Sequence, residues 1–173
     1  MSFSIKPEKI SVSRYTAVMG MLFAVSAVLN AVESMFSAFL PAGIRIGLSN
    51  IVIMAAVMCI NIPSAFLLTL LKAFFVFLTR GLTAGMMSFC GGAAAFAVTV
   101  LMFKKTDSSL VFISVLSALA HTCGQLAAAS VLMKTATVFA YAPVLIISSA
   151  AAGICTGIVL RAVFPEIKRI LKT

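Results

Sequence analysis

The sequence predicts an all-α integral membrane protein with six transmembrane helices, and three observations support this. Of the 173 residues, 62% are hydrophobic and only 10% are charged, whereas a soluble domain carries about a quarter charged residues. The mean hydropathy is +1.20. The apolar stretches approach the ~20 residues that a helix needs to cross a bilayer, and the alternating ten-residue segments of membrane β-barrels are absent.

Six apolar stretches mark the helices in order and lie at residues 15–35, 46–60, 62–80, 86–103, 110–133 and 138–164. Basic residues precede the first stretch, as they would in a signal peptide. The apolar run nevertheless continues to about Val32 and five more follow, so we expect an uncleaved first helix. The second stretch is short. Because no linker, low-complexity tract or charge block divides the chain, we predict a single membrane domain over residues 1–173.

The basic residues predict the orientation in the membrane. With the N-terminus inside, nine of them fall on the cytoplasmic side and three near the outer side. Cytoplasmic loops are enriched in lysine and arginine, so we expect the N-in, C-in topology and no nucleic-acid partner. The inner nine are Lys6, Lys9, Arg14, Lys104, Lys105, Arg161, Lys168, Arg169 and Lys172, and the outer three are Arg45, Arg80 and Lys134.

Polar side chains within the apolar stretches are the first functional candidates, because an ionisable group in the hydrocarbon costs on the order of 2.5–3.5 kcal/mol. In the N-in orientation the candidates all lie in the outer half of the membrane, on the first, second, third and fifth helices. They are Asn30, Glu33, Arg45, Asn50, Lys72, Arg80, His121 and Gln125.

Helical periodicity places many of these side chains on shared faces. The face of the first helix comprises Ser26, Asn30, Glu33 and Ser37; that of the third comprises Thr69, Lys72 and Thr79; that of the fifth comprises Ser114, Ser117, His121 and Gln125. We therefore expect four helices to line one cavity that opens to the outside.

The charges in this predicted cavity favour an anionic ligand, because the basic groups outnumber Glu33. Simpler explanations stay open for each of them. Arg45 and Arg80 could extend to lipid headgroups. Lys72 could form a structural ion pair with Glu33, and His121 could be a core histidine with a local hydrogen-bond partner.

Small residues form a second stripe on the first helix, made of Gly20, Ala24, Ala27 and Ala31. They lie within about 60° of one another and roughly 100° away from the polar face. Small residues allow close approach of helices in lipid. The stripe could therefore pack inside the chain or dock another membrane subunit.

The remaining small residues are interpreted as structural. We expect the glycine pairs 81/85, 91/92 and 153/157 to serve internal packing or turns. The scattered cysteines show no CxxC spacing, so we predict buried apolar residues without disulfides or metal; they are Cys59, Cys90, Cys123 and Cys155.

The sequence lacks the usual residues for catalysis. It has no GxxxxGK[ST] loop for nucleotide hydrolysis, and its four acidic residues lie too far apart in sequence to hold Mg²⁺ for diphosphate chemistry. One histidine without a paired acid is poorly suited to a hydrolytic triad. We therefore expect a binding protein without a metal or cofactor, not an enzyme.

Two stretches resemble a known family. "ESMFSAFLPAGIRIGLSNI" (33–51) and "AHTCGQL" (120–126), within six helices of this length, resemble the Gx transporter family, whose members are often labelled heptaprenyl diphosphate synthase component I. That family is similar to the substrate-binding S components of energy-coupling factor transporters. Such components are six-helix bundles that bind a micronutrient from outside and depend on a membrane coupling subunit and two cytoplasmic ATPases.

The resemblance implies roles for the matching residues. Glu33, Arg45, Gly47, Asn50, His121 and Gln125 fall in the motifs, and the stripe from Gly20 to Ala31 resembles the docking face of S components. The expected function is capture of a small anionic micronutrient or precursor in a bacterial cytoplasmic membrane. Two alternatives stay open, an accessory component of polyprenyl diphosphate or quinone synthesis and a self-sufficient ion-coupled carrier.

Overall fold

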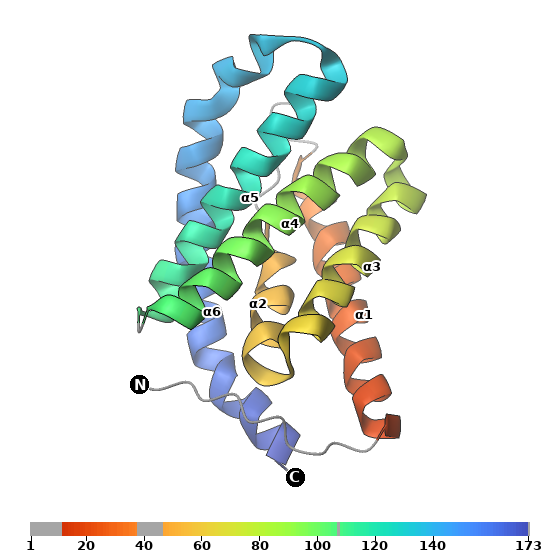
Figure 1. The fold of residues 1–173 in the computed structure, drawn as a ribbon, viewed down its shortest axis with the longest axis vertical. Helices are drawn as coiled ribbons and strands as arrows, with labels where there is room; N and C mark the ends of the chain where they lie inside the picture. The colour runs from red at the N-terminus through yellow and green to blue at the C-terminus, as the bar shows by residue number, and fades with distance from the viewer. Residues whose placement is uncertain (1–11, 38–46, 107, 173) are drawn as a thin grey trace.

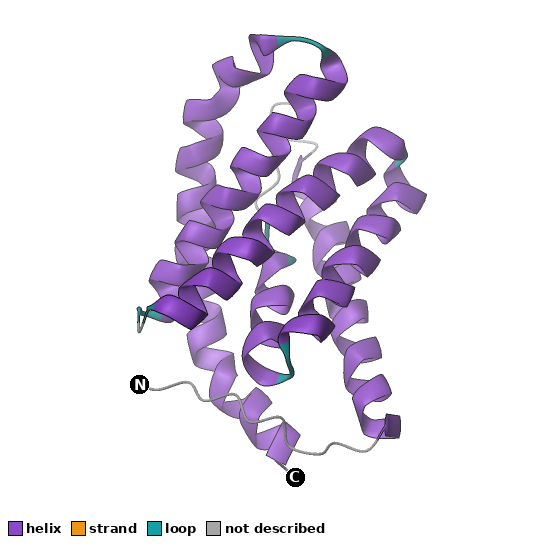
Figure 2. Cartoon of the chain, viewed as in Figure 1, coloured by secondary structure: helices purple, strands orange, loops and turns teal. Residues whose placement is uncertain are grey.

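The computed structural model describes residues 12–37, 47–106 and 108–172, and within them the chain is helical throughout apart from short connections (Figures 1 and 2). The elements are α1 (Val12–Ser37), α2 (Asn50–Cys59), α3 (Ile62–Arg80), α4 (Leu82–Lys105), α5 (Leu110–Met133), the 3-10 helix η1 (Ala136–Tyr141) and α6 (Ala142–Lys172). The predicted all-α fold with a short second helix is confirmed.

Five of these helices are long and apolar enough to cross a membrane. Their outward surfaces carry large hydrophobic side chains, including Phe74, Leu78 and Ile147, which are 58%, 65% and 72% exposed. A surface of this kind suits contact with hydrocarbon rather than with water. The helix α1 begins, and α6 ends, at the same end of the bundle (Figure 1).

The helix α2 covers only half of the membrane. Its ten residues span about 15 Å, against a hydrocarbon thickness of about 30 Å. The predicted stretch 46–60 was too long at its start, because residues 47–49 form a turn before the helix. At the other end, the Asn61 side chain accepts a hydrogen bond from Ser64 N at 2.8 Å, and Pro63 fits the first turn of α3.

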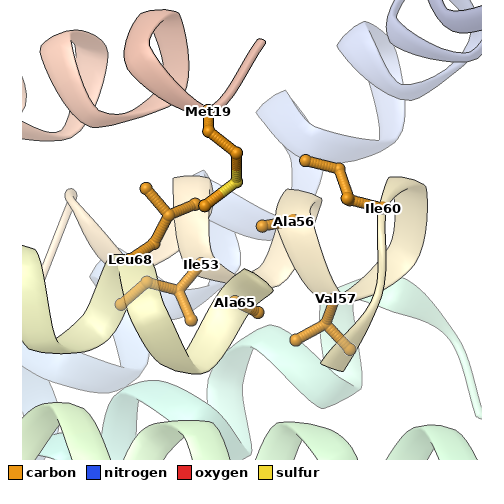
Figure 3. Close-up of a cluster of buried hydrophobic side chains, with 7 residues drawn as sticks. All are labelled: Met19, Ile53, Ala56, Val57, Ile60, Ala65 and Leu68. Atoms are coloured by element: carbon orange, nitrogen blue, oxygen red, sulfur yellow. The ribbon is translucent and has the colours of Figure 1, made fainter. Parts of the chain in front are cut away.

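Two apolar clusters hold α2 at the centre of the bundle. The first lies between α1, α2 and α3 (Figure 3) and consists of Met19, Ile53, Ala56, Val57, Ile60, Ala65 and Leu68. The second joins the opposite side of α2 to α5 and α6 and consists of Met54, Ala55, Met58, Ile113 and Leu160. All side chains from Val52 to Met58 are buried, so α2 has no lipid-facing stripe in its middle.

Glycines bring the long helices close together. A Cβ placed on Gly124 would lie 2.7 Å from Cys90 O on α4, and one on Gly153 would lie 2.7 Å from Val115 Cα on α5. Gly85 meets Phe77 in the same way, while Gly81 has φ +86 in the turn between α3 and α4. The expected packing and turn roles of the glycine pairs are therefore confirmed. Among the described residues, α1 packs only against α2 and α3.

This packing predicts opposite effects for the same substitution at two glycines. Gly124→Ala should lower the free energy of unfolding by about 1–3 kcal/mol, because the new methyl group meets backbone that cannot easily move. Gly20→Ala should raise it slightly, since nothing lies within 4 Å of that position and alanine favours the helix. Unfolding midpoints of the purified variants check this, and equal midpoints would contradict the packing.

The cysteines correct one expectation. Cys90, Cys123 and Cys155 are exposed and Cys59 is partly buried, so the prediction that all four are buried was wrong. A thiol behaves as a small apolar group, and a surface that faces lipid accommodates it as well as a core does. All four are free thiols, as expected.

Candidate ligand-binding site

The structure buries most of the polar side chains that the sequence singles out. Glu33 is 3% exposed, Lys72 4%, His121 3% and Gln125 5%. Glu33 comes from α1, Lys72 from α3, and His121 and Gln125 from α5. Lys72 and His121 lie far from the ends of their helices. The interior of the bundle therefore contains a polar cluster at the depth where the surrounding membrane would be hydrocarbon.

The hairpin of α2 and α3 brings Lys72 and Asn50 together. Both lie eleven positions from Asn61, so each stands about 16 Å from the turn along its helix. Lys72 Nζ donates a hydrogen bond to Asn50 Oδ1 at 2.8 Å. Since an ammonium group only donates, the Asn50 amide turns its oxygen to Lys72. Its Nδ2 is buried and has no hydrogen-bond partner among the described residues.

Gly47 connects this pair to α1. Its backbone N–H donates to Glu33 Oε1, and its carbonyl accepts from Asn50 N at 2.9 Å. The φ angle of Gly47 is +77, and a Cβ there would lie 3.2 Å from Asn50 Nδ2. Only glycine fits this position without strain, which explains why the turn before α2 needs it.

His121 approaches the same turn from α5, and Gln125 contacts His121 one helical turn further along. Gln125 Nε2 lies 3.0 Å from His121 Nε2, and a Cβ on Gly47 would lie 3.8 Å from His121 Cδ2. On α4, a Cβ on Gly91 would lie 2.7 Å from Gln125 Cγ and 2.9 Å from His121 Cε1. Gly91 thus leaves the space that these two side chains occupy.

A small cavity of about 10 Å³ adjoins the cluster between α2, α5 and α6, enough for about one water molecule. It is lined by Gly47, Asn50, Ile51, Met54, Ser114, Ser117, Ala118 and Thr156. The sequence predicted one cavity, open to the outside, between the first, second, third and fifth helices. Beside the cluster, the described residues instead pack around this small space, and α6 takes part in it.

Thr156 and Gly91 are members of the site that the sequence reasoning missed. Thr156 Oγ1 lies 2.8 Å from Ser114 Oγ on α5. A signal for α6 was present in its buried face, which repeats small and polar residues at helical spacing through Ser149, Ala152, Gly153, Thr156 and Gly157. The role of Gly91 depends on which helix faces it, and helical spacing does not reveal that.

Some predicted residues lie outside the cluster. Arg45 lies outside the described residues. Arg80 ends α3, is partly exposed, and stands eight positions or about 12 Å beyond Lys72 along the helix. Thr79 lies about 20° from Lys72 around the helix, as predicted, but it stands about two turns further along α3, where it is exposed and bonds Phe75 O in its own helix at 2.8 Å.

The small-residue stripe of α1 faces away from the polar cluster. Gly20, Ala24 and Ala31 are exposed and Ala27 is partly buried, whereas Ser26 and Glu33 are buried on the other side. Close packing inside the described part of the chain therefore does not account for the stripe.

Hydrogen-bond donors dominate the cluster. Lys72 Nζ and Asn50 Nδ2 stand at the start of α2, the Gln125 amide bonds His121, and Glu33 is the carboxylate that accepts from Gly47. The described residues contain no group of three or more His, Cys, Asp or Glu side chains that could hold a metal ion. The chemistry of this set suits recognition of a group rich in oxygen acceptors.

The fold and the cluster define a multi-pass α-helical membrane protein with a polar site inside the bundle. A family model described as heptaprenyl diphosphate synthase component I matches residues 22–163. This is most of the chain, which therefore belongs to that family, as the resemblance of its motifs predicted. No curated protein and no solved structure matches the chain significantly.

Proposed function

We propose that the chain is the substrate-binding subunit of an energy-coupling factor type transporter in a bacterial cytoplasmic membrane. It captures a small anionic micronutrient or precursor from outside and does not itself catalyse a reaction. The observation that carries the proposal is Lys72, a cation buried at mid-depth that is held on Asn50 at the start of a half-length helix.

The start of α2 supports an anionic ligand. A helix N-terminus carries a partial positive charge, and half-helices in transporters direct this end at anionic groups of the substrate. Ser49, the residue at the N-cap, is 1% exposed, and its hydroxyl has no hydrogen-bond partner among the described residues. Together with Asn50 Nδ2 it offers hydrogen bonds that an oxyanion would accept.

Buried polar groups that lack a hydrogen-bond partner destabilise the protein when no ligand is bound. A buried polar group without a partner costs about 1–3 kcal/mol. Ligand oxygens near Ser49 and Asn50 would remove that cost and place negative charge near Lys72. Binding would therefore stabilise the turn that precedes α2.

Glu33 has a positioning role in this proposal. Its carboxylate accepts the Gly47 N–H and so fixes the turn from which Asn50 extends. His121 faces the other side of Gly47, and it would orient the ligand together with its neighbour Gln125. The positive charge near the ligand would come from Lys72, with Arg45 as a further candidate.

The transport cycle requires partners. The exposed stripe of Gly20, Ala24, Ala27 and Ala31 would dock the membrane coupling subunit, because small residues let a second helix approach closely in lipid. Cytoplasmic ATPases would supply the energy. Arg14 near the start of α1, and Lys168, Arg169 and Lys172 near the end of α6, lie at the common end of these two helices (Figure 1), which agrees with a cytoplasmic location for that end.

Replacing Ala24 by leucine tests the docking stripe. Ala24 is exposed, so the larger side chain should leave the fold and ligand binding unchanged while it abolishes co-purification with the coupling subunit and the ATPases. Ala97→Leu on the exposed side of α4 is the matched control. Normal recovery of the complex with Ala24→Leu would exclude this stripe as the docking surface.

The description of the family also names a synthase component, which defines a competing function. An accessory role in polyprenyl diphosphate synthesis predicts that synthase activity in cell extracts falls when the gene is deleted. The transport proposal predicts instead that ATP-dependent uptake of an external anionic solute is lost. Loss of synthase activity with unchanged uptake would overturn the transport proposal.

A further inference from the structure

An apolar groove of about 280 Å³ lies on the surface between α3 and α4, apart from the polar cluster. It is lined by Leu70, Ala73, Phe74 and Phe77 on α3 and by Gly85, Met86, Phe89 and Cys90 on α4. Gly85 allows the two backbones to meet closely at Phe77. Phe74 and Phe89, which are 58% and 43% exposed, belong to the opposite sides of the groove.

The groove together with Arg80 matches the depth of one leaflet of the bilayer. Arg80 ends α3, and Leu70 lies ten positions earlier, or about 15 Å along the helix. Half of the hydrocarbon thickness of a bilayer is also about 15 Å. With Arg80 at the membrane surface, the groove would run from Phe77, one turn below that surface, to about the middle of the membrane.

A basic residue stands at the open end of this groove. Arg80 is partly exposed and makes no ion pair or hydrogen bond within the part of the chain that the structure describes. Thr79 and Thr83 beside it are exposed. An arginine guanidinium binds phosphate oxygens through paired hydrogen bonds, so a phosphate at this level of the membrane would meet both charge and donors.

We propose that this groove is a binding site for one anionic phospholipid. An acyl chain lies along the groove from Phe77 to Leu70, and the phosphate is held by Arg80. In the N-in orientation the lipid belongs to the outer leaflet. The site is independent of the proposed transport function, and it assigns Arg80 to a lipid instead of to the transported ligand.

The chemistry of the lining favours a lipid over the other possible occupants. A small hydrophilic anion would find no hydrogen bond in a groove lined by aliphatic and aromatic side chains and one thiol. The small-residue stripe suited to a helix of another subunit lies on α1, not on α3 or α4. A cation above an apolar groove one leaflet deep complements the two parts of an anionic lipid.

Native mass spectrometry of the full chain with defined lipids tests the site. The protein is purified, depleted of lipid and titrated with phosphatidylglycerol or phosphatidylcholine. We expect one phosphatidylglycerol to be retained at concentrations where phosphatidylcholine is not. Arg80→Gln should weaken this retention about fivefold, as expected for one basic residue at a membrane surface.

A second variant tests the acyl-chain part of the site. Cys90→Trp fills the groove from an exposed position and should abolish retention of the single lipid. Cys155→Trp, also at an exposed cysteine, and Arg161→Gln, at an exposed arginine of α6, are the matched controls and should behave as the unmodified protein does. Equal retention of the two lipids, or unchanged retention in both Arg80→Gln and Cys90→Trp, would overturn the proposal.

Discussion

Replacing Lys72 by methionine is expected to weaken binding of the transported anion at least about thirtyfold while the protein stays folded. Removal of one member of a buried, hydrogen-bonded charged pair costs a complex about 2–5 kcal/mol. The fold should tolerate the change better, because methionine fills a similar volume without a buried charge. Removing the buried charge stabilises the fold, but this gain is offset in part because Asn50 Oδ1 loses its hydrogen-bond donor, which costs about 1–3 kcal/mol.

The measurement for Lys72→Met is the occupancy of the small molecule that is retained through purification, together with the unfolding midpoint. Lys104→Met is the control, because Lys104 is an exposed lysine at the end of α4. Unchanged occupancy in Lys72→Met would remove Lys72 from the ligand site.

A double substitution separates ligand binding from a purely structural role of Lys72. If Lys72 mainly balances the buried charge of Glu33, Lys72→Met should destabilise the protein, and adding Glu33→Gln should restore stability and occupancy together. If Lys72 binds the ligand, Glu33→Gln should leave the loss of occupancy in place. The interaction between the two substitutions is obtained from the four unfolding midpoints and occupancies.

Replacing Gly47 by alanine is the second substitution with a large expected effect. The φ angle of +77 lies in the left-handed region, where a side chain costs about 1–2 kcal/mol. The added Cβ also stands 3.2 Å from Asn50 Nδ2, so the Asn50 amide that bonds Lys72 must move by a few tenths of an ångström. We expect both a lower unfolding midpoint and loss of the retained small molecule.

Gly81 provides a matched control for Gly47. Its φ angle is +86, and no atom lies within 4 Å of a Cβ placed there. Gly81→Ala should therefore lower the unfolding midpoint by a similar amount and leave ligand occupancy unchanged. Equal occupancy in the two variants would mean that the position of Asn50 does not matter for binding.

Local signals made much of the fold predictable. The ranges 62–80 and 110–133 agree with α3 and α5 as the structure has them, because polar capping residues at Asn61 and Ser109 and a glycine at residue 81 interrupt the apolar runs. The start of α2 was not predictable from hydropathy, because the turn at Gly47 is set by its contact with Glu33.

The candidate site was partly predictable for a related reason. Burial cost identifies Glu33, Lys72 and His121, since such groups are rarely placed in hydrocarbon without a function. The contributions of Gly91 and Thr156 follow from which helices are neighbours, and that order depends on tertiary packing. The same limit explains why the burial of the cysteines was predicted wrongly, because their apolar character does not distinguish a core position from a lipid-facing surface.

Identification of the small molecule held by the purified chain tests the central proposal most directly. Native mass spectrometry followed by fragmentation should reveal one anionic molecule per chain in the unmodified protein and in Lys104→Met, and none in Lys72→Met. A retained molecule that is neutral or cationic, or one that Lys72→Met retains equally well, would contradict the proposal that Lys72 and the start of α2 form an anion-binding site.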